Sequence, residues 1–105
     1  MPTYLLTYHG GDVPGSDEER ASQDEAWGEW FATLGPAVLV AGDPIAVTRE
    51  ILPDGSVTEP DDDDPVGGYS VVVAEDLDAA LALAADCPIL DVGGSVRVGE
   101  AVPMG

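Results

Sequence analysis

The run from Tyr69 to Ala74 constrains the fold most, because it is short, almost wholly apolar and rich in β-branched residues. Six residues are too few for a core helix, so the run predicts a strand. Val71 and Val73 would face one side of this strand, and Val72 and Ala74 would face the other. A strand that is apolar on both sides belongs in the centre of a sheet whose two faces are both covered.

Three other segments are predicted strands. Thr3 to Tyr8 is apolar, aromatic and β-branched, and it stops before Gly10-Gly11. Ala37 to Ala41 is an apolar run that we expect to form a buried strand. Ser95 to Glu100 alternates with a period of two, which is typical of a half-exposed edge strand.

Two helices are predicted between these strands. The S-x-x-E patterns at Ser16 and at Ser22 can each start the first helix as a capping box, and Gly35-Pro36 ends it. Asp76 caps the second helix, which Cys87-Pro88 stops. The predicted order of elements is therefore βαββαβ.

An extra hairpin and an acidic loop are expected between the second and third strands. Ile45 to Leu52 and Val57-Thr58 flank Pro53-Asp54-Gly55-Ser56, whose Asp-Gly pair is typical of a hairpin turn. Glu59 to Pro65 contains four consecutive aspartates and cannot be buried, so we expect a solvated, mobile loop.

The order of elements predicts an α+β fold of the ferredoxin-like type, with both helices on one face of an antiparallel sheet. With 105 residues, the chain has material for one core, so residues 1–105 are expected to form a single domain. The other sheet face would be bare, although the central strand is apolar on both sides. We therefore expect a symmetric homodimer in which a second copy covers that face.

The charge balance is strongly acidic, since 21 Asp and Glu residues face three arginines and no lysine, for a formal net charge of −18. Such a surface repels phosphate backbones and anionic lipids, so neither nucleic acid nor a membrane is expected as a partner. The chain has no apolar run of about 20 residues and no signal-peptide pattern at its start. We therefore expect a cytoplasmic protein. Cys87 alone cannot form an internal disulfide, so nothing in the chain depends on an oxidising compartment.

The predicted topology brings four junctions to one end of the sheet: Tyr8 to Gly10, Gly42 to Pro44, Gly67 to Tyr69, and Cys87 to Ser95. A pocket for an unidentified small molecule is expected there, between the helices and the sheet end. The residues expected to line it are Tyr8, Trp27, Trp30, Phe31, Tyr69, Cys87 and Ser95.

His9 and Asp43 are the candidate catalytic residues, because an imidazole beside an orienting carboxylate can transfer protons near neutral pH. In the alternative interpretation, His9 bonds to the adjacent glycine turn and Asp43 begins a turn before Pro44. Cys87 follows a helix C-terminus, where the dipole disfavours a thiolate, so we expect a small buried side chain. Asp61 to Asp64 lacks the ligand spacing of a calcium loop, and no metal or cofactor is expected.

Five motifs follow one another along the chain: Met1 to Gly11, Trp27-Gly28-Glu29-Trp30-Phe31, Gly68 to Val72, Cys87 to Leu90 and Gly93 to Val98. Together they resemble the YCII-related family, in its DGPF-domain branch. The resemblance implies ferredoxin-like subunits paired as a dimeric α/β-barrel, and an enzymatic role that rests on a His and Asp pair in a cleft. It implies a small-molecule enzyme or ligand-binding dimer, with a non-catalytic protein-interaction or regulatory accessory module as the alternative.

Overall fold

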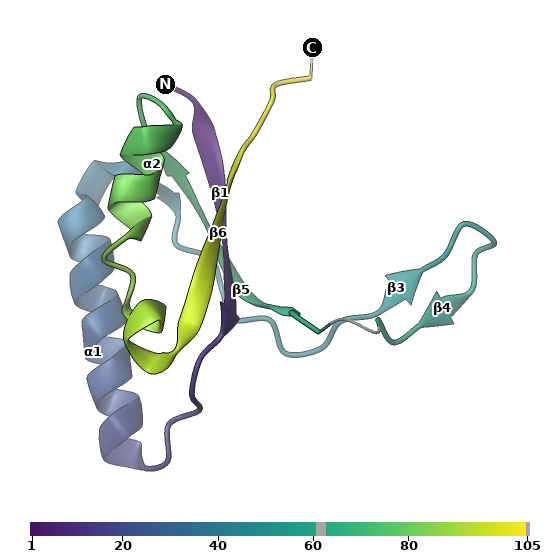
Figure 1. The fold of residues 1–105 in the computed structure, drawn as a ribbon, viewed down its shortest axis with the longest axis horizontal. Helices are drawn as coiled ribbons and strands as arrows, with labels where there is room; N and C mark the ends of the chain where they lie inside the picture. Colours follow the sequence, from purple (N-terminus) through teal and green to yellow (C-terminus); the bar gives the residue numbers. More distant parts are fainter. Residues whose placement is uncertain (61–62, 105) are drawn as a thin grey trace.

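The structure is a computed structural model, which describes residues 1–60 and 63–104. Figure 1 shows a curved sheet with both helices on one side and a long hairpin that projects from the opposite side. The main elements in chain order are β1 (Thr3–Gly10), α1 (Asp17–Leu34), β2 (Val38–Val40), β3 (Glu50–Ile51), β4 (Val57–Thr58), β5 (Val66–Val73), α2 (Leu77–Ala84) and β6 (Gly94–Glu100). Two short 3₁₀ helices, Gly35–Ala37 and Pro88–Val92, follow α1 and α2.

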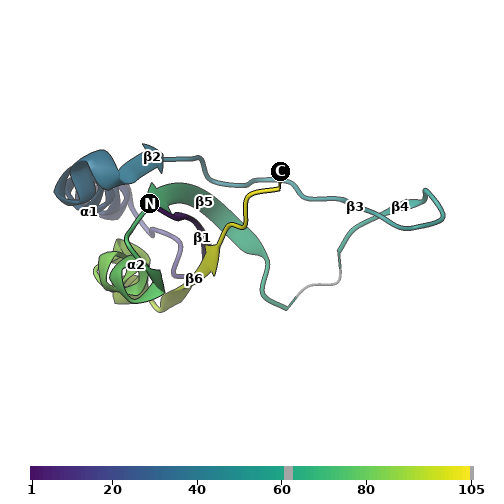
Figure 2. The ribbon, with the colours of Figure 1, turned by 90° about the horizontal axis from the view of Figure 1, so that it is seen from above.

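The main sheet has the order β2-β5-β1-β6, and all three pairings are antiparallel. Each helix therefore connects two strands that are not adjacent in the sheet, β1 with β2 through α1 and β5 with β6 through α2, whereas β2 and β5 pair directly. Seen from above, α1 and α2 lie side by side against the sheet (Figure 2). The α+β class, the antiparallel sheet and its two helices are thus confirmed, and the arrangement is consistent with the ferredoxin-like fold.

Side chains that alternate along β1 and β5 separate the two faces of the sheet. Tyr4, Leu6 and Val72 are fully buried on the face toward the helices. Leu5 is 45% exposed on the other side, which we call the open face. The apolar core of this chain therefore lies on one side of the sheet only.

The helix ends follow the expected capping chemistry. Ser16 is the residue that caps α1, and its Oγ accepts a 3.1 Å hydrogen bond from the Glu19 amide. Asp76 caps α2 in the same way, since its carboxylate accepts a 2.8 Å bond from the Ala79 amide. The α2 helix ends at Ala84, before the predicted stop at Cys87-Pro88.

The expectation that the second strand is buried is wrong for this chain. Only Val38–Val40 forms a strand, and Leu39 and Val40 are 55% and 45% exposed. The sheet order explains the difference, because β2 is an edge strand that pairs only with β5. Only one neighbouring strand therefore packs beside its apolar side chains.

The expected hairpin is present, as a separate two-stranded sheet of β3 and β4 that lies away from the body (Figures 1 and 2). Gly55 turns the chain with φ of 89°, and the Asp54 carboxylate accepts a 2.9 Å bond from the Ser56 amide. We call residues 45–60 the hairpin arm. Of the acidic loop expected after it, Asp61 and Asp62 lie outside the described residues, whereas Asp64 contacts the sheet.

Across the described ranges 1–60 and 63–104, no helix combines the length and the apolar character that crossing a membrane requires.

Candidate functional site

A cavity of about 380 Å³ lies where β1, β2 and β5 meet α1 at one end of the sheet. Its walls come from the strand junctions and from one face of α1. They are formed by Tyr8, Gly10, Asp24, Trp27, Phe31, residues 41–44, residues 67–69 and Ile89. The cavity is therefore built from segments that are distant in sequence and that the sheet order brings together.

Aromatic rings form one side of this cavity. The ring centroids of Tyr8 and Trp27 are 4.8 Å apart, with the rings nearly perpendicular, and those of Trp27 and Phe31 are 6.0 Å apart. Trp27 and Phe31 are separated by one turn of α1, so a helix places both on the face toward the sheet. Trp30 does not line the cavity, because it is 5% exposed in the core and its indole donates a 3.1 Å bond to the Leu83 carbonyl on α2.

The Tyr8 hydroxyl is held by a buried chain of hydrogen bonds. It donates a 2.6 Å bond to the Ser70 hydroxyl, which donates a 2.5 Å bond to the Ala41 carbonyl. Burial raises the pKa of the Tyr8 phenol to about 12, although the Ser70 bond acts in the opposite direction. Tyr8 is therefore a neutral hydrogen-bonding group at physiological pH, and this chain joins β1, β5 and the segment after β2.

Two glycines allow close backbone contact in the cavity wall that residues 41–44 and 67–69 form. Gly42 has φ of 80°, and a Cβ there would lie 1.7 Å from the Tyr69 carbonyl oxygen. Gly68 pairs with Pro44 in an isolated bridge, and its Cβ position is 3.4 Å from the Asp43 carbonyl. A side chain at Gly42 would push this wall away from β5.

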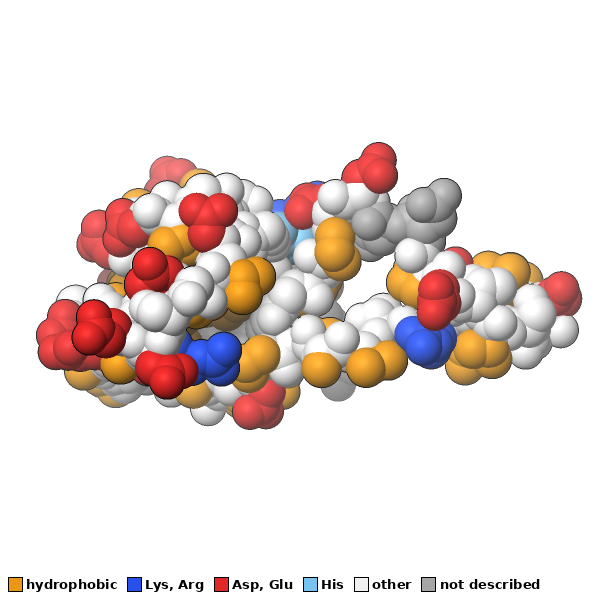
Figure 3. All heavy atoms as spheres, turned by 90° about the horizontal axis from the view of Figure 1, so that it is seen from below, with side chains coloured by type: hydrophobic (Ala, Val, Ile, Leu, Met, Phe, Trp, Pro, Cys, Tyr) orange, Lys and Arg blue, Asp and Glu red, His pale blue; other side chains and the backbone are white. Residues whose placement is uncertain are grey.

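A second hollow of about 340 Å³ adjoins the cavity. The two share Gly10, Trp27 and Ile89, and the second is also lined by Asp12 and Asp91. Figure 3 shows this side of the molecule, with acidic side chains gathered over the body and hydrophobic side chains along the hairpin arm.

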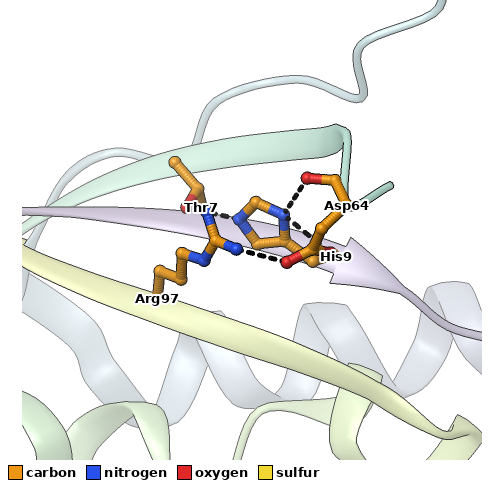
Figure 4. Close-up of polar contacts among 4 residues, drawn as sticks. All are labelled: Thr7, His9, Asp64 and Arg97. Carbon is orange, nitrogen blue, oxygen red and sulfur yellow. Dashed lines mark hydrogen bonds and ion pairs between the residues drawn. The ribbon is translucent and has the colours of Figure 1, made fainter. Parts of the chain in front are cut away.

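His9 lies on the open face, because it follows Tyr8 on β1 and successive side chains of a strand point to opposite faces. Its ring is 1% exposed. Nε2 lies 2.8 Å from the Thr7 hydroxyl, and Nδ1 lies 3.2 Å from the Asp64 backbone carbonyl and 3.3 Å from its carboxylate (Figure 4). Arg97 forms an ion pair with the other carboxylate oxygen of Asp64.

The hydrogen bonds define the state of the His9 ring. A carbonyl oxygen can only accept, so Nδ1 carries a proton and donates it to Asp64. In the neutral ring, Nε2 then accepts from the Thr7 hydroxyl. The imidazole is thus fixed in one orientation by partners on both sides.

The structure separates the two candidate catalytic residues. Asp43 lines the cavity, whereas the hydrogen bonds and ion pair of His9 join it to Thr7 and Asp64. No hydrogen bond or ion pair joins His9 to Asp43 in the part of the chain that the structure describes. The cause is the alternation of β1, which turns Tyr8 toward the cavity and His9 away from it.

Four of the residues expected to line the pocket do so: Tyr8, Trp27, Phe31 and Tyr69. Cys87 is 1% exposed in the core, where burial raises the pKa of its thiol to about 11. Ser95 is exposed on β6, opposite His9. Sequence reasoning missed Asp24, although its spacing of three and seven residues before Trp27 and Phe31 places it on the same helix face.

Comparison with known proteins supports the fold of the chain and matches it to no family. No family model matches the chain, and no curated protein matches it. Among solved structures, it is similar to 5-chloro-2-hydroxyhydroquinone dehydrochlorinase (TftG) from Burkholderia phenoliruptrix AC1100, in complex with 2,5-dihydroxybenzoquinone. The TM-score is 0.51, with 23% identity over 90% of each chain. This likeness supports the small α+β fold, and the similar protein is an enzyme.

Proposed function

We propose that this chain is a small-molecule-binding domain of the YCII-related type, which works as an enzyme or ligand-binding homodimer. The sheet-end cavity carries the proposal. Its volume of about 380 Å³ falls within the range of small-molecule sites, and it combines aromatic walls with a few polar groups. Tyr8, Trp27, Phe31 and Tyr69 are the residues that we assign to ligand contact.

Two further observations support this role. The YCII-like motifs at Met1 to Gly11 and at Trp27 to Phe31 include the segments that form the cavity. The similar solved structure is an enzyme with a small quinone bound. Because one fold can host unrelated activities, we infer the function of this chain from its own cavity and not from that reaction.

The open face supports the proposed homodimer. Leu5 is 45% exposed there, and Val71 and Val73 of β5 are only partly buried. These residues alternate with the fully buried Val72, so β5 presents apolar side chains on both sides of the sheet. A second copy of this face would cover them in a symmetric interface.

We assign proton transfer in the cavity to Asp43. Asp43 lines the cavity, where it can meet a bound ligand. His9 lies on the opposite face of the sheet, where Thr7 and Asp64 hold its ring in one tautomer and leave it 1% exposed. It therefore does not reach a ligand in this cavity, and we give it a structural role.

A thermal-shift screen of a metabolite library tests the binding site. We expect hits that stabilise the unmodified chain and the Ile51→Ala control, since Ile51 is exposed on the hairpin arm. The same hits should lose most of their effect on Phe31→Ala. Equal stabilisation of both variants by every hit, or no hits at all, would remove the basis for the cavity as a ligand site.

Mass spectrometry of each hit after incubation with the chain tests catalysis. Conversion that is lost in Asp43→Asn, at a ligand concentration that saturates the variant, is the expected result for the proposed proton-transfer residue. Conversion that survives this substitution would exclude Asp43. Binding without conversion would indicate that the chain binds its ligand and does not catalyse a reaction.

The alternative is a protein-interaction module, and the hairpin arm favours it. Val47, Ile51 and Val57 are 72%, 74% and 61% exposed on this arm, which has no core of its own. Sedimentation of the Ile51→Asp, Val57→Asp double variant distinguishes the two functions. An interaction module predicts a change of assembly with no effect on hits from the screen.

A further inference from the structure

We propose that the sheet-end cavity selects organic cations, in particular ammonium compounds with an apolar or aromatic body, and excludes carboxylates and phosphates. This inference rests on the proposed function, because it names the class of ligand for the same cavity. It follows from three properties of the site: the charges on its walls, the placement of the arginines and the kind of surface that the rings offer.

The charges on the walls are negative. Asp24 and Asp43 both line the cavity, and they come from different segments, one from α1 and the other from the residues after β2. The adjoining hollow is lined by Asp12 and Asp91. A cation in either space would meet carboxylates from more than one element, whereas an anion would meet their repulsion.

The basic residues lie elsewhere. None of the three arginines is among the described residues that line either hollow. Arg97 forms an ion pair with Asp64 on the open face, and Arg49 lies 3.6 Å from Glu59 on the hairpin arm. Arg20 is on α1, one turn before Asp24, and lines neither space. With no lysine in the chain, the cavity has no counter-charge for an anionic ligand.

The rings complete the match to an apolar cation. Trp27 and Phe31 are part-buried and line the cavity beside Tyr8. Tryptophan is the side chain whose face attracts cations best, and the aromatic walls also cover the body of a ligand. The net charge of −18 adds a long-range field that raises the local concentration of cations.

Calorimetric titration with three probes of matched shape tests the inference: benzylammonium, benzyl alcohol and benzoate. Benzylammonium should bind at least about tenfold more tightly than the alcohol, since only the ammonium makes charge-assisted contacts, and benzoate should not bind. The proposal fails, with the cavity intact as a ligand site, if the alcohol or benzoate binds as tightly as the ammonium. If no probe binds, the proposed function fails with it.

Charge-neutralised variants separate the cavity from the general field. Asp43→Asn and Asp24→Asn should each lower the affinity for benzylammonium by about tenfold. Asp78→Asn removes one charge on α2 outside both hollows, so it should leave this affinity within about twofold. Equal weakening in all three variants would show attraction by net charge alone and would overturn the proposal. Circular dichroism of each variant confirms that the fold is retained.

Discussion

Tyr8 and Ser70 form a buried hydroxyl pair, in which the phenol donates a 2.6 Å hydrogen bond across the β1–β5 pairing. Because Ser70 in turn donates to the Ala41 carbonyl, one serine satisfies groups on two other segments. The Ser70 side chain is fully buried. The cavity wall at Tyr8 and the segment that follows β2 therefore depend on the same side chain.

Replacing Ser70 by Ala should destabilise the protein by about 1–3 kcal/mol, because it leaves the Tyr8 hydroxyl and the Ala41 carbonyl without a partner. Tyr8→Phe should cost less, about 1 kcal/mol, since Ser70 keeps its bond to Ala41. Urea unfolding of both variants gives the two free energies. An equal or larger loss in Tyr8→Phe would contradict the role given to Ser70.

The start of α1 supplies a prediction with a built-in control. Ser16→Ala removes the oxygen that accepts the Glu19 amide and should cost about 1 kcal/mol of unfolding free energy. Ser22 belongs to a second S-x-x-E pattern but lies inside α1, so Ser22→Ala should be neutral or slightly stabilising. If Ser22→Ala costs as much as Ser16→Ala, the helix begins later than Asp17.

Local chemistry therefore predicted the ends of the elements well. Ser16 and Asp76 cap helices by hydrogen bonds to residues three positions away, so the pattern is visible in any short window of sequence. The edge position of β2 could not be found in this way. An apolar run such as Val38–Val40 has the same composition at the edge of a sheet as in its centre, and only the strand order decides its burial.

The candidate site was predictable in place more than in detail. Topology brings the strand ends together, and the helical spacing of Trp27 and Phe31 orients two wall residues. Alternation along β1 already implies that Tyr8 and His9 face opposite ways, which argues against His9 in the same cavity. The partner of His9 could not be read locally, because Asp64 reaches it from 55 residues away.

Alkaline pH should unfold the protein through its buried tyrosines and its thiol. Burial raises the pKa of Cys87 from 9.0 to about 11 and that of Tyr8 from 10.0 to about 12. For Tyr4, burial and Glu100 together raise the pKa to about 12. The unfolded chain therefore loses these protons at a lower pH than the folded chain. Their contribution to the free energy of unfolding is fully present below about pH 9 and is lost as the pH rises to about 12.

Urea unfolding across this range measures the effect. Cys87→Ala should flatten the curve between about pH 9 and 11, and Tyr8→Phe should flatten it between about pH 10 and 12. If the curve for either variant runs parallel to that of the unmodified chain, the raised pKa of the replaced group does not cause the loss of stability.

Added salt should stabilise this protein. A protein that is stabilised by surface ion pairs would instead lose stability as salt screens them. With a net charge of −18 and three arginines, repulsion outweighs attraction in the folded state. Raising ionic strength from about 0.01 to 0.15 M shortens the screening length from about 30 to 8 Å. The urea midpoint in potassium chloride should rise over this range. A midpoint that falls would indicate that ion pairs such as Arg97 with Asp64 dominate.

The contacts of His9 predict a large difference between two substitutions in the same cluster. His9→Ala removes a ring that is 1% exposed, together with its hydrogen bonds to the Thr7 hydroxyl and the Asp64 carbonyl, so it should cost about 2–4 kcal/mol. Asp64→Asn keeps that backbone carbonyl and loses the carboxylate charge, which faces both Arg97 and the His9 ring. The side chains of Asp64 and Arg97 are 44% and 65% exposed, so this loss should stay below about 1 kcal/mol. Urea unfolding at neutral pH measures both. Equal losses would mean that the carboxylate of Asp64, and not its backbone, holds the imidazole in place.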